Sequence, residues 1–247
     1  MPNKRDDEIL DHIGRYGVTL RAVLEHLYFD GRDKACDAVL NRLVKDHKIV
    51  SSEGLPGGLN YYHLSIPEAR KRRIPDHRAR PKKSRALREA LHVLWFCCMT
   101  KHVRRRIEGR QVQKQFGRAN GLGKPHCRET VKDTLFLYRV YSPGPGSRDD
   151  YLLKIIRGDW ARAEQNPAMA EWMDAGAYRF AILLESSHRR DKLLQAFRSD
   201  DIPTPHIEFV PGLGSLHRII AEFKQAHPPA WYKTPPAWFI SMKGGTK

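Results

Sequence analysis

Two acids and two lysines in the second half of the chain are of the types that a metal-dependent phosphodiester hydrolase uses. Asp133 precedes the apolar run TLFLYRVY, and Glu185 ends the run RFAILLE. Such a site needs an acid at one strand and a carboxylate-x-lysine pair on the next, to hold Mg²⁺ and activate water. Lys154 has Leu152 two positions before it, and Lys192 follows Glu185 at a looser spacing. We therefore interpret both acids as solvent-side or capping groups and predict no catalytic residue, with a metal-dependent nuclease as an alternative.

Other ligand-binding patterns fail on spacing. The stretch GRANGLGKPH has one residue too many for a phosphate-binding P-loop, and Pro125 stands where Ser or Thr would bind magnesium. The four cysteines include no C-x-x-C pair, and the histidines show no ligand spacing with them (His12, His26, His102 and His126). We therefore expect no metal and no cofactor, and we expect the cysteines to be reduced thiols.

Polar residues also follow two of the predicted strands. The sequence ESSH starts at Glu185, and PGLGS occupies residues 211–215. Ligands of open α/β sheets collect at the carboxyl ends of strands and at helix N-termini, so an anion or phosphate is one interpretation of these residues. Ordinary helix capping explains the same residues and is the interpretation that we favour.

The charge of the chain predicts the class of partner. Lys and Arg total 44 against 28 Asp and Glu, which gives a net charge of +16 and a pI of about 9.9. This bias favours a nucleic acid or an acidic membrane surface. The start MPNKRDDEIL has no apolar segment of a signal peptide, and the longest apolar run, residues 90–99, is far short of the roughly 20 residues of a membrane span. We expect a cytoplasmic protein, with an amphipathic membrane helix at residues 86–106 as a further alternative.

Residues 1–66 have the pattern of a winged helix-turn-helix. Apolar residues at helical spacing predict helices at residues 5–16, from about 19 to 31, and from about 34 to 45, and HKIVSS and NYYHLS predict a hairpin around EGLPGG. The third helix would enter the major groove, and the hairpin tip would reach the minor groove or the backbone. The predicted DNA contacts are Arg32, Lys34, Asn41, Arg42, Lys45 and Asn60. The module holds nine Lys/Arg and ten Asp/Glu, so a dimerisation or protein-docking role stays open.

The excess positive charge begins directly after this module. The run ARKRRIPDHRARPKKSRALRE, residues 69–89, contains two prolines and no apolar period, which predicts a basic linker at residues 67–85. Basic residues there and in the next predicted helix would neutralise phosphates and release counterions. We predict that the backbone is contacted by Arg70, Lys71, Arg72, Arg73, Lys82, Lys83, Arg85, Arg104, Arg105 and Arg106. A solvated tether without contacts is the alternative.

Residues 86–227 predict a small mixed α/β domain. A long helix at 86–106 is followed by two β-rich runs, DTLFLYRVYS and DYLLKIIRG, which we interpret as a hairpin. A helix from Asn166, the buried strand YRFAILLES, a helix, the strand HIEFV and a helix at about 216–226 follow. In the tail, residues 228–247, the repeated PPAW would pack on the domain or bind a partner protein.

This layout resembles the replication-relaxation or mobilisation-accessory proteins of plasmids and integrative elements. The resemblance is one of architecture, a winged helix, a basic linker and a restriction-endonuclease-like core. It is carried by the pattern AVLNRLVKDHKIV, by Asp133 before its strand and by Glu185 at the end of RFAILLE. It implies DNA handling, either operon regulation or help in loading a relaxase or a replication protein.

The sequence therefore predicts an α/β (α+β) protein, a winged helix followed by an inactive restriction-endonuclease-like domain. It would bind double-stranded DNA as a regulator or accessory factor of a mobile element, without chemistry of its own. Candidate protein partners are a second copy of the chain, as a homodimer, and a relaxase, replication or conjugation protein. An RNA- or protein-binding scaffold is the remaining alternative, and no membrane is expected.

Overall fold

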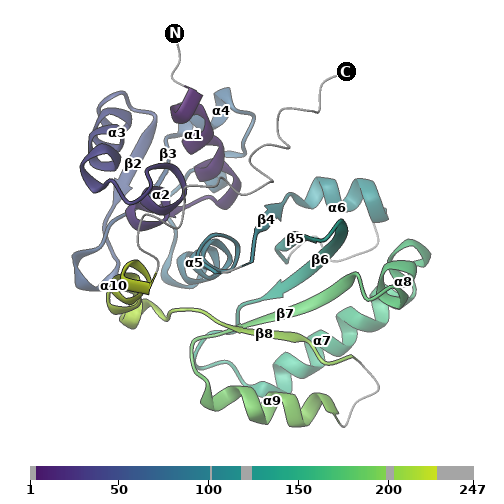
Figure 1. The fold of residues 1–247 in the computed structure, drawn as a ribbon. Helices are drawn as coiled ribbons and strands as arrows, with labels where there is room; N and C mark the ends of the chain where they lie inside the picture. The colour runs from purple at the N-terminus through teal and green to yellow at the C-terminus, as the bar shows by residue number, and fades with distance from the viewer. Residues whose placement is uncertain (1–3, 101, 118–123, 199–202, 227–247) are drawn as a thin grey trace. The chain divides into compact units, whose positions relative to one another are not determined.

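The computed structural model describes residues 4–100, 102–117, 124–198 and 203–226 of the chain. The chain divides into two compact units, one of Met1–Pro81 with Leu213–Lys247 and one of Lys82–Gly212 (Figure 1). The first unit is thus built from both ends of the chain, and the second is inserted between them. This division differs from the predicted boundaries, because residues 67–81 and the last described helix belong to the first unit.

The first part of the first unit consists of three helices and a small antiparallel sheet. Its elements are α1 (Lys4–Tyr16), β1 (Thr19–Leu20), α2 (Arg21–Tyr28), α3 (Asp33–Lys45), β2 (Ile49–Ser52) and β3 (Tyr61–Leu64). The strands lie in the order β1-β3-β2. The predicted helices and hairpin are present in the predicted order, and β1 is an addition, since two residues are too short for a periodic pattern.

The inward face of α3 is formed by three residues at helical spacing. Cys36, Leu40 and Leu43 are buried in one core with Ile9 and Ile13 of α1. Ala35, Val39 and Val44 of the same helix are only partly buried. A reduced cysteine packs as a small apolar residue, so Cys36 completes an i, i+4, i+7 row that the pattern of larger residues hides.

The predicted linker is folded over most of its length. Helix α4 (Ile66–Lys71) is capped by Ser65, whose Oγ accepts a hydrogen bond from the Glu68 amide at 3.3 Å, and a 3₁₀ turn covers Asp76–Arg78. Ala69 and Ala79 are buried in the core of the first unit. The prediction of a tether at residues 67–85 is therefore wrong up to about residue 81. Two alanines among many charges were enough to anchor the segment.

The second unit is a mixed five-stranded sheet covered by helices. Its strands are β4 (Arg104–Ile107), β5 (His126–Val131), β6 (Thr134–Tyr141), β7 (Tyr178–Leu184) and β8 (His206–Phe209), in the order β4-β5-β6-β7-β8. Strands β4, β5 and β6 pair antiparallel, and β6, β7 and β8 pair parallel. The chain then leaves the sheet for α10 (Leu216–Ala226), which belongs to the first unit.

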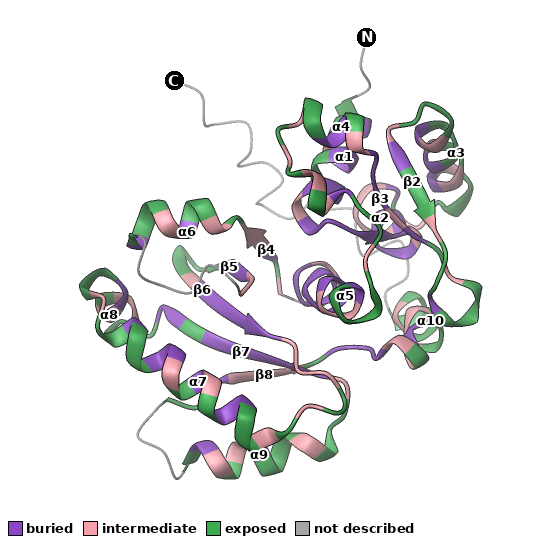
Figure 2. Ribbon diagram, turned by 180° about the vertical axis from the view of Figure 1, so that it is seen from behind, coloured by how far each residue is buried: buried purple, intermediate pink, exposed green. Residues whose placement is uncertain are grey.

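Helices cover both faces of this sheet. Four helices share one core with it: α6 (Gly109–Phe116), α7 (Asp149–Glu164), α8 (Pro167–Asp174) and α9 (His188–Arg198). On the opposite face lies α5 (Ser84–Cys98), where Phe96 contacts Tyr138 edge-on and Cys97 Sγ lies 3.4 Å from Cys127 Sγ. Figure 2 shows α5 and α7 on opposite sides of the sheet, and both helices carry buried residues.

Two predicted elements of this unit are wrong. The run DYLLKIIRG is part of α7 and no strand, because Leu152, Ile156, Trp160 and Ala163 are buried at helical spacing along sixteen residues. The run DYLLKIIRG has only nine residues, which is too few to distinguish the helical period of 3.6 residues from the strand period of 2. The helix predicted at 86–106 ends at Cys98, so that Arg104, Arg105 and Arg106 lie on β4.

Candidate nucleic-acid interface

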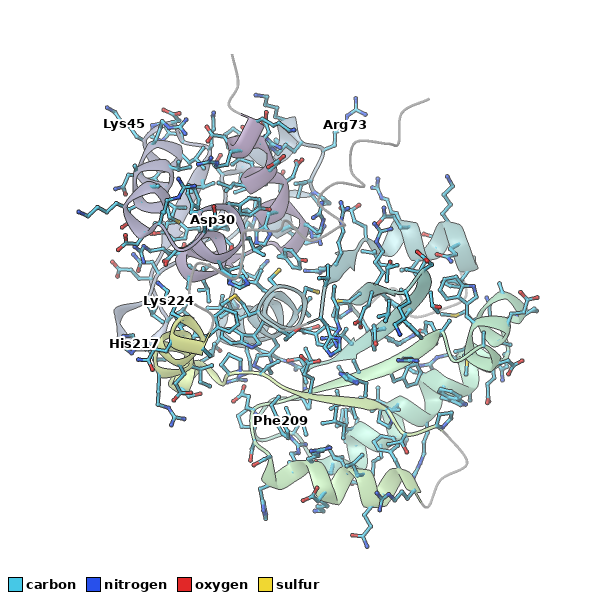
Figure 3. The ribbon with its side chains drawn as sticks, in the orientation of Figure 1. Asp30, Lys45, Arg73, Phe209, His217 and Lys224 are labelled. Carbon is cyan, nitrogen blue, oxygen red and sulfur yellow. The ribbon has the colours of Figure 1, made fainter. Side chains whose placement is uncertain are left out.

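An exposed polar stripe runs along α3. Lys34, Ala38, Asn41 and Lys45 are all exposed, and their spacing of four, three and four residues keeps them on one face of the helix. Lys45 extends away from the end of α3 (Figure 3). Ala38 leaves the middle of this stripe low, because its side chain is a single methyl group. We call these four residues the α3 stripe.

Arg42, which the sequence assigns to the same surface, is bound to the first helix. Its Nη1 and Nη2 donate to the two carboxylate oxygens of Asp6 at 2.6 and 2.8 Å. The Asp6 side chain is only 5% exposed, whereas that of Arg42 is 43% exposed. The hydrogen bond from Arg42 to Asp6 raises the pKa of Arg42. Arg42 therefore joins α3 to α1, and a base contact would have to compete with this ion pair.

The other residues predicted on this surface are exposed. Arg32 donates through Nε to the Phe29 carbonyl at 3.0 Å and lies 3.5 Å from Asp30, so its direction is partly fixed. Asn60 is exposed at the start of β3. Both remain available at the surface of the first unit.

The hairpin tip contacts another part of the first unit. A Cβ atom on Gly57, in the turn between β2 and β3, would come within 3.4 Å of His217 on α10. Helix α10 also contacts α2, where Lys224 donates to Glu25 at 2.7 Å and Phe223 lies edge-on to His26. Figure 3 labels His217 and Lys224 on this helix. No local pattern predicts that the hairpin tip is partly covered by residues 160 positions later in the chain.

Within the predicted linker, two arginines are engaged by acids of the first unit. Arg72 is paired with Glu68, Asp7 and Asp11 at 2.6, 2.6 and 2.5 Å, and its side chain is 15% exposed. Arg70 pairs with Asp76 at 2.6 Å. Lys71 and Arg73 are exposed, as are Lys83 and Arg85 in the second unit, whereas Lys82 is half-buried.

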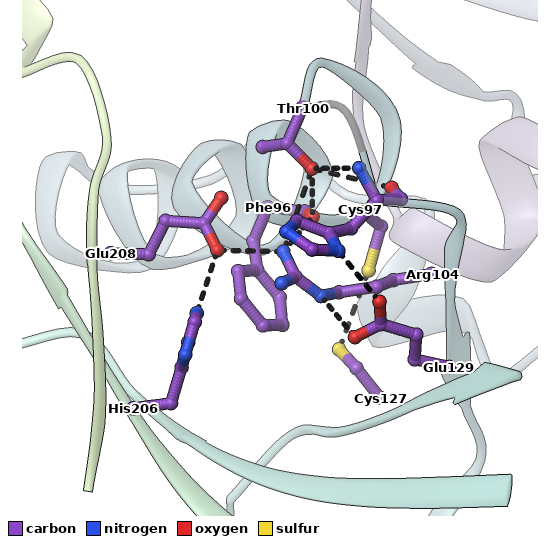
Figure 4. A network of polar contacts seen from close by, with 9 residues as sticks. Phe96, Cys97, Thr100, Arg104, Cys127, Glu129, His206 and Glu208 are labelled. Carbon is purple, nitrogen blue, oxygen red and sulfur yellow. Dashed lines mark hydrogen bonds and ion pairs between the residues drawn. The ribbon is translucent and has the colours of Figure 1, made fainter. Parts of the chain in front are cut away.

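Arg104 is removed from the surface altogether. Its side chain is 0% exposed, and it pairs with Glu129 at 3.0 Å and with Glu208 at 2.7 Å (Figure 4). Its guanidinium carbon lies 3.9 Å from the centroid of the Phe96 ring, under α5. Arg104 therefore links β4, β5 and β8, and its side chain is not exposed at the surface where the sequence prediction placed it. Arg105 and Arg106 are half-buried on the same strand.

The acids of this network are held in their charged form. Burial acts to raise the pKa of Glu129, but Arg104, Tyr138 and His102 together outweigh burial and the pKa is lowered. Burial also acts to raise the pKa of Glu208, but His206 and Arg104 together lower it. His102 and His206 lie at the rim, 2.8 Å from Glu129 and 3.0 Å from Glu208. The arrangement is that of a structural ion-pair network inside the sheet.

The candidate nuclease residues do not come together. Asp133 is exposed in the two-residue turn between β5 and β6, where Lys132 and Asp133 have positive φ angles of 45° and 67°. Glu185 follows the end of β7, which runs parallel to β6. The start of one strand and the end of the other lie at opposite edges of the sheet, and Lys154 and Lys192 are exposed on α7 and α9. Instead of a metal, Glu185 faces Arg88 at 3.1 Å.

The described residues also bear on the predictions about metals and membranes. In the described part of the chain, no group of three or more His, Cys, Asp or Glu residues is placed to hold a metal ion. No described helix has both the length and the apolarity needed to cross a membrane. The tail with its PPAW repeat, residues 228–247, lies outside the described residues, as does the loop 118–123 of the rejected P-loop pattern.

Comparisons of the chain with protein-family models, with curated proteins and with solved structures find no match.

Proposed function

We propose that the chain is a double-stranded-DNA-binding protein whose first unit contains a winged helix, with the α3 stripe in the major groove. The single observation that carries this proposal is the stripe itself, a continuous exposed row on the third helix of a helix–helix–helix–hairpin module. In helix-turn-helix proteins the helix at this position enters the groove. The chemistry of the stripe fits base edges.

Each member of the α3 stripe has a counterpart in the groove. An asparagine amide can both donate to and accept from an adenine edge, and a lysine can donate to guanine or to phosphate. A methyl group such as that of Ala38 packs on the thymine methyl. Lys34 and Lys45 lie near the two ends of α3, where they would reach the flanking phosphates.

Phosphate contacts would add affinity that does not depend on sequence. Residues 1–66 are close to neutral, with nine basic and ten acidic residues, so most of the net charge of +16 lies later in the chain. In the first unit Lys71 and Arg73 are exposed basic residues of the former linker. Lys83 and Arg85 would add contacts from the second unit.

The same proposal keeps the role implied by the resemblance stated above, a regulator or accessory factor of a mobile element. Its second unit would be a restriction-endonuclease-like sheet that has lost nuclease chemistry. The separation of Asp133 from Glu185 supports that loss, because two metal ligands must lie within a few ångströms of one ion.

The proposal is tested by selecting preferred duplexes from a random pool with the full chain and then measuring binding to the best duplex and to scrambled duplexes. We expect Asn41→Ala with Lys45→Ala to abolish the preference, since a good base contact contributes roughly 1–3 kcal/mol. Binding to scrambled DNA should be nearly retained. Lys4→Ala, an exposed lysine of α1, serves as the control and should preserve the preference. Selection of no sequence at all, or an unchanged preference in the double variant, would contradict the proposal.

A further inference from the structure

A cavity of about 600 Å³ lies in the second unit where β6 passes into α7. The sequence SPGPGS, residues 142–147, forms one wall of it. The residues that line the cavity include four basic side chains and one acidic side chain, which are Arg85, Arg88, Lys124, Arg148 and Glu89. It lies at the carboxyl edge of the parallel strands, where α/β sheets bind their ligands. Its lining therefore favours an anionic ligand.

A serine on this wall is hydrogen-bonded to a buried histidine. Ser142 is half-exposed, lines the cavity and directly follows β6. Its Oγ lies 2.7 Å from Nδ1 of His92, which comes from α5 on the opposite side of the strand end. The His92 side chain is 1% exposed. A serine is a weak nucleophile alone and becomes a strong one when an adjacent imidazole removes its proton.

An acid lies on the far side of the same imidazole. Glu185 Oε1 is 3.2 Å from Nε2 of His92, and the Glu185 side chain is 22% exposed. Burial, followed by the nearby Arg88, lowers the pKa of His92 to about 4, so the ring is neutral at pH 7. Nε2 of His92 and Oε1 of Glu185 are close but not aligned as a hydrogen bond. A neutral imidazole carries one N–H, and the charge of the nearby carboxylate favours that proton on Nε2. The lone pair of Nδ1 is then directed at the hydroxyl of Ser142.

We propose that Ser142, His92 and Glu185 form the catalytic group of a hydrolase, in which Ser142 Oγ attacks the carbonyl carbon of an ester that carries a negative charge. A nucleophile, a base within hydrogen-bond reach and a group that orients the base are the three parts that such a site requires. Ser142 and His92 take part in the bond changes. Glu185 is a positioning residue that acts through His92.

The reaction needs no reactant except the ester and water. As the bond from Ser142 Oγ to the carbonyl carbon forms, the hydroxyl proton passes to Nδ1 of His92 and an electron pair moves onto the carbonyl oxygen. When this pair returns, the bond to the leaving alkoxide breaks and the alkoxide takes the proton from His92. Water, losing a proton to the same nitrogen, then cleaves the acyl-Ser142 ester and restores the hydroxyl.

Arg88 is placed to stabilise the charge that develops in this reaction. A Cβ atom on Gly144 would come within 3.4 Å of Arg88 Nη1, so the guanidinium lies against the wall two residues after Ser142. Arg88 also lies 3.1 Å from Glu185, and this contact keeps the guanidinium beside the three residues of the catalytic group. Fixed positive groups near a developing oxyanion are among the largest sources of catalysis. The more distant Arg85 and Lys124 would bind the anionic part of the ester.

The first test is covalent labelling of the full chain with a fluorophosphonate, which loses fluoride as a serine oxygen bonds to phosphorus. We expect one label per chain, mapped by mass spectrometry to Ser142. Ser142→Ala should remove it, and His92→Gln should slow it about a hundredfold or more, the usual contribution of a general base. Ser84→Ala, an exposed serine at the start of α5, is the matched control and should leave the rate unchanged.

A second measurement uses only the wild-type chain. The titratable and charged groups that face His92 are Arg88 on its own helix and Glu185 after β7. The labelling rate should be flat between pH 5 and 8, since His92 stays neutral. A rate that rises tenfold per pH unit would mean that hydroxide, and no base of the protein, deprotonates the serine, and would overturn the proposal.

Two further results bear on the roles of Glu185 and of the cavity. In Glu185→Gln the imidazole nitrogen NMR signals of His92 should lose the Nε2–H tautomer, a change that loss of packing alone would not produce. The wild type should hydrolyse the nitrophenyl half-ester of succinate, which is anionic, at least tenfold faster than nitrophenyl acetate, and Arg85→Gln with Lys124→Gln should remove this difference. No label on Ser142 in the folded chain, or labelling that is insensitive to His92, would overturn the assignment. Equal rates for the two esters would overturn the anionic substrate.

Discussion

The two guanidinium nitrogens of Arg42 hold the two carboxylate oxygens of Asp6 at 2.6 and 2.8 Å, although the residues are 36 positions apart. Asp6 is buried and Arg42 is half-exposed. The pair fixes α3 against α1 directly after Asn41, near the C-terminal end of the α3 stripe. Its loss should therefore act on stability before it acts on recognition.

Replacing Arg42 by alanine leaves a buried carboxylate without its partner. We expect a loss of about 1–3 kcal/mol in the free energy of unfolding, measured by urea denaturation. Arg32→Ala, whose ion pair with Asp30 is exposed, should change it by less than about 0.5 kcal/mol. An Arg42→Ala protein of wild-type stability that has lost only its preferred duplex would show that Arg42 reads bases.

The salt dependence of DNA binding should identify the residues that contact phosphates. Replacing the exposed Lys71, Arg73, Lys83 and Arg85 by glutamine should flatten the slope of log K against log salt. Each lost phosphate contact contributes about 0.9 to that slope, so four contacts would change it by roughly 3 to 4. Replacing the engaged Arg70 and Arg72 instead should change it much less. The slopes are measured by anisotropy titrations of one duplex at several salt concentrations.

Arg104→Met should damage folding without a specific effect on DNA binding. The substitution leaves Glu129 and Glu208 unpaired inside the sheet, and breaking a buried ion pair costs about 3–5 kcal/mol. Arg85→Met, at an exposed position, should be nearly neutral. Chemical denaturation measures both. If Arg104→Met were as stable as the wild type but bound DNA more weakly at every sequence, Arg104 would belong to the interface after all.

The ion pairs of Arg104 with Glu129 and Glu208 should also make the stability of the protein sensitive to acid. The pKa values of Glu129 and Glu208 are lowered in the folded chain, with Arg104 among the causes that overcome burial. Their contribution is complete above their ordinary pKa of about 4.5 and is lost as the pH falls through the lower folded values. The thermal midpoint of the wild type should fall below about pH 5, and that of Glu129→Gln should fall less steeply.

Three buried histidines should add a separate pH dependence to the free energy of unfolding, at higher pH than the two acids. Burial, with neighbouring arginines, lowers the pKa of His12 to about 3 and those of His92 and His126 to about 4, against 6.5 in the unfolded chain. Between pH 4 and 6.5 the unfolded chain thus binds more protons, so stability falls as the pH falls below 6.5. His12→Asn should reduce the proton uptake on unfolding by about one, as obtained from unfolding curves at several pH values. An unchanged uptake would mean that His12 is charged in the folded chain.

The sequence predicted the elements that have a clear period and failed where one residue decides between surface and core. Helices α1, α2 and α3 and strand β7 follow uninterrupted patterns and were predicted. Arg104 and Arg139 are as basic as Arg105 and Arg73, yet both are buried, because acids from distant strands and helices meet them. Nothing near Arg104 in the sequence signals Glu208, which lies 104 residues away.

The same limit applies to the cavity in the second unit. Ser142 follows a strand and precedes a Pro/Gly turn, and His92 interrupts an apolar run, so each carries a weak local signal. Their meeting depends on α5 crossing the end of β6, which no local pattern encodes. Glu185 is recognisable in the sequence as an acid at a strand end. That position indicates capping or metal binding, and it does not indicate contact with an imidazole.

The return of the chain to its first unit has a consequence for biosynthesis. The salt bridge from Lys224 to Glu25 spans 199 residues, and α10 reaches α2 and the hairpin tip only after the entire second unit has been made. A nascent chain emerging from the ribosome can build the helices of the first unit early, but it lacks the segment that covers the hairpin. The inserted unit can fold as a continuous stretch in the meantime. A product truncated before α10 would therefore expose the uncovered hairpin, which makes the completed first unit a mark of synthesis through residue 226.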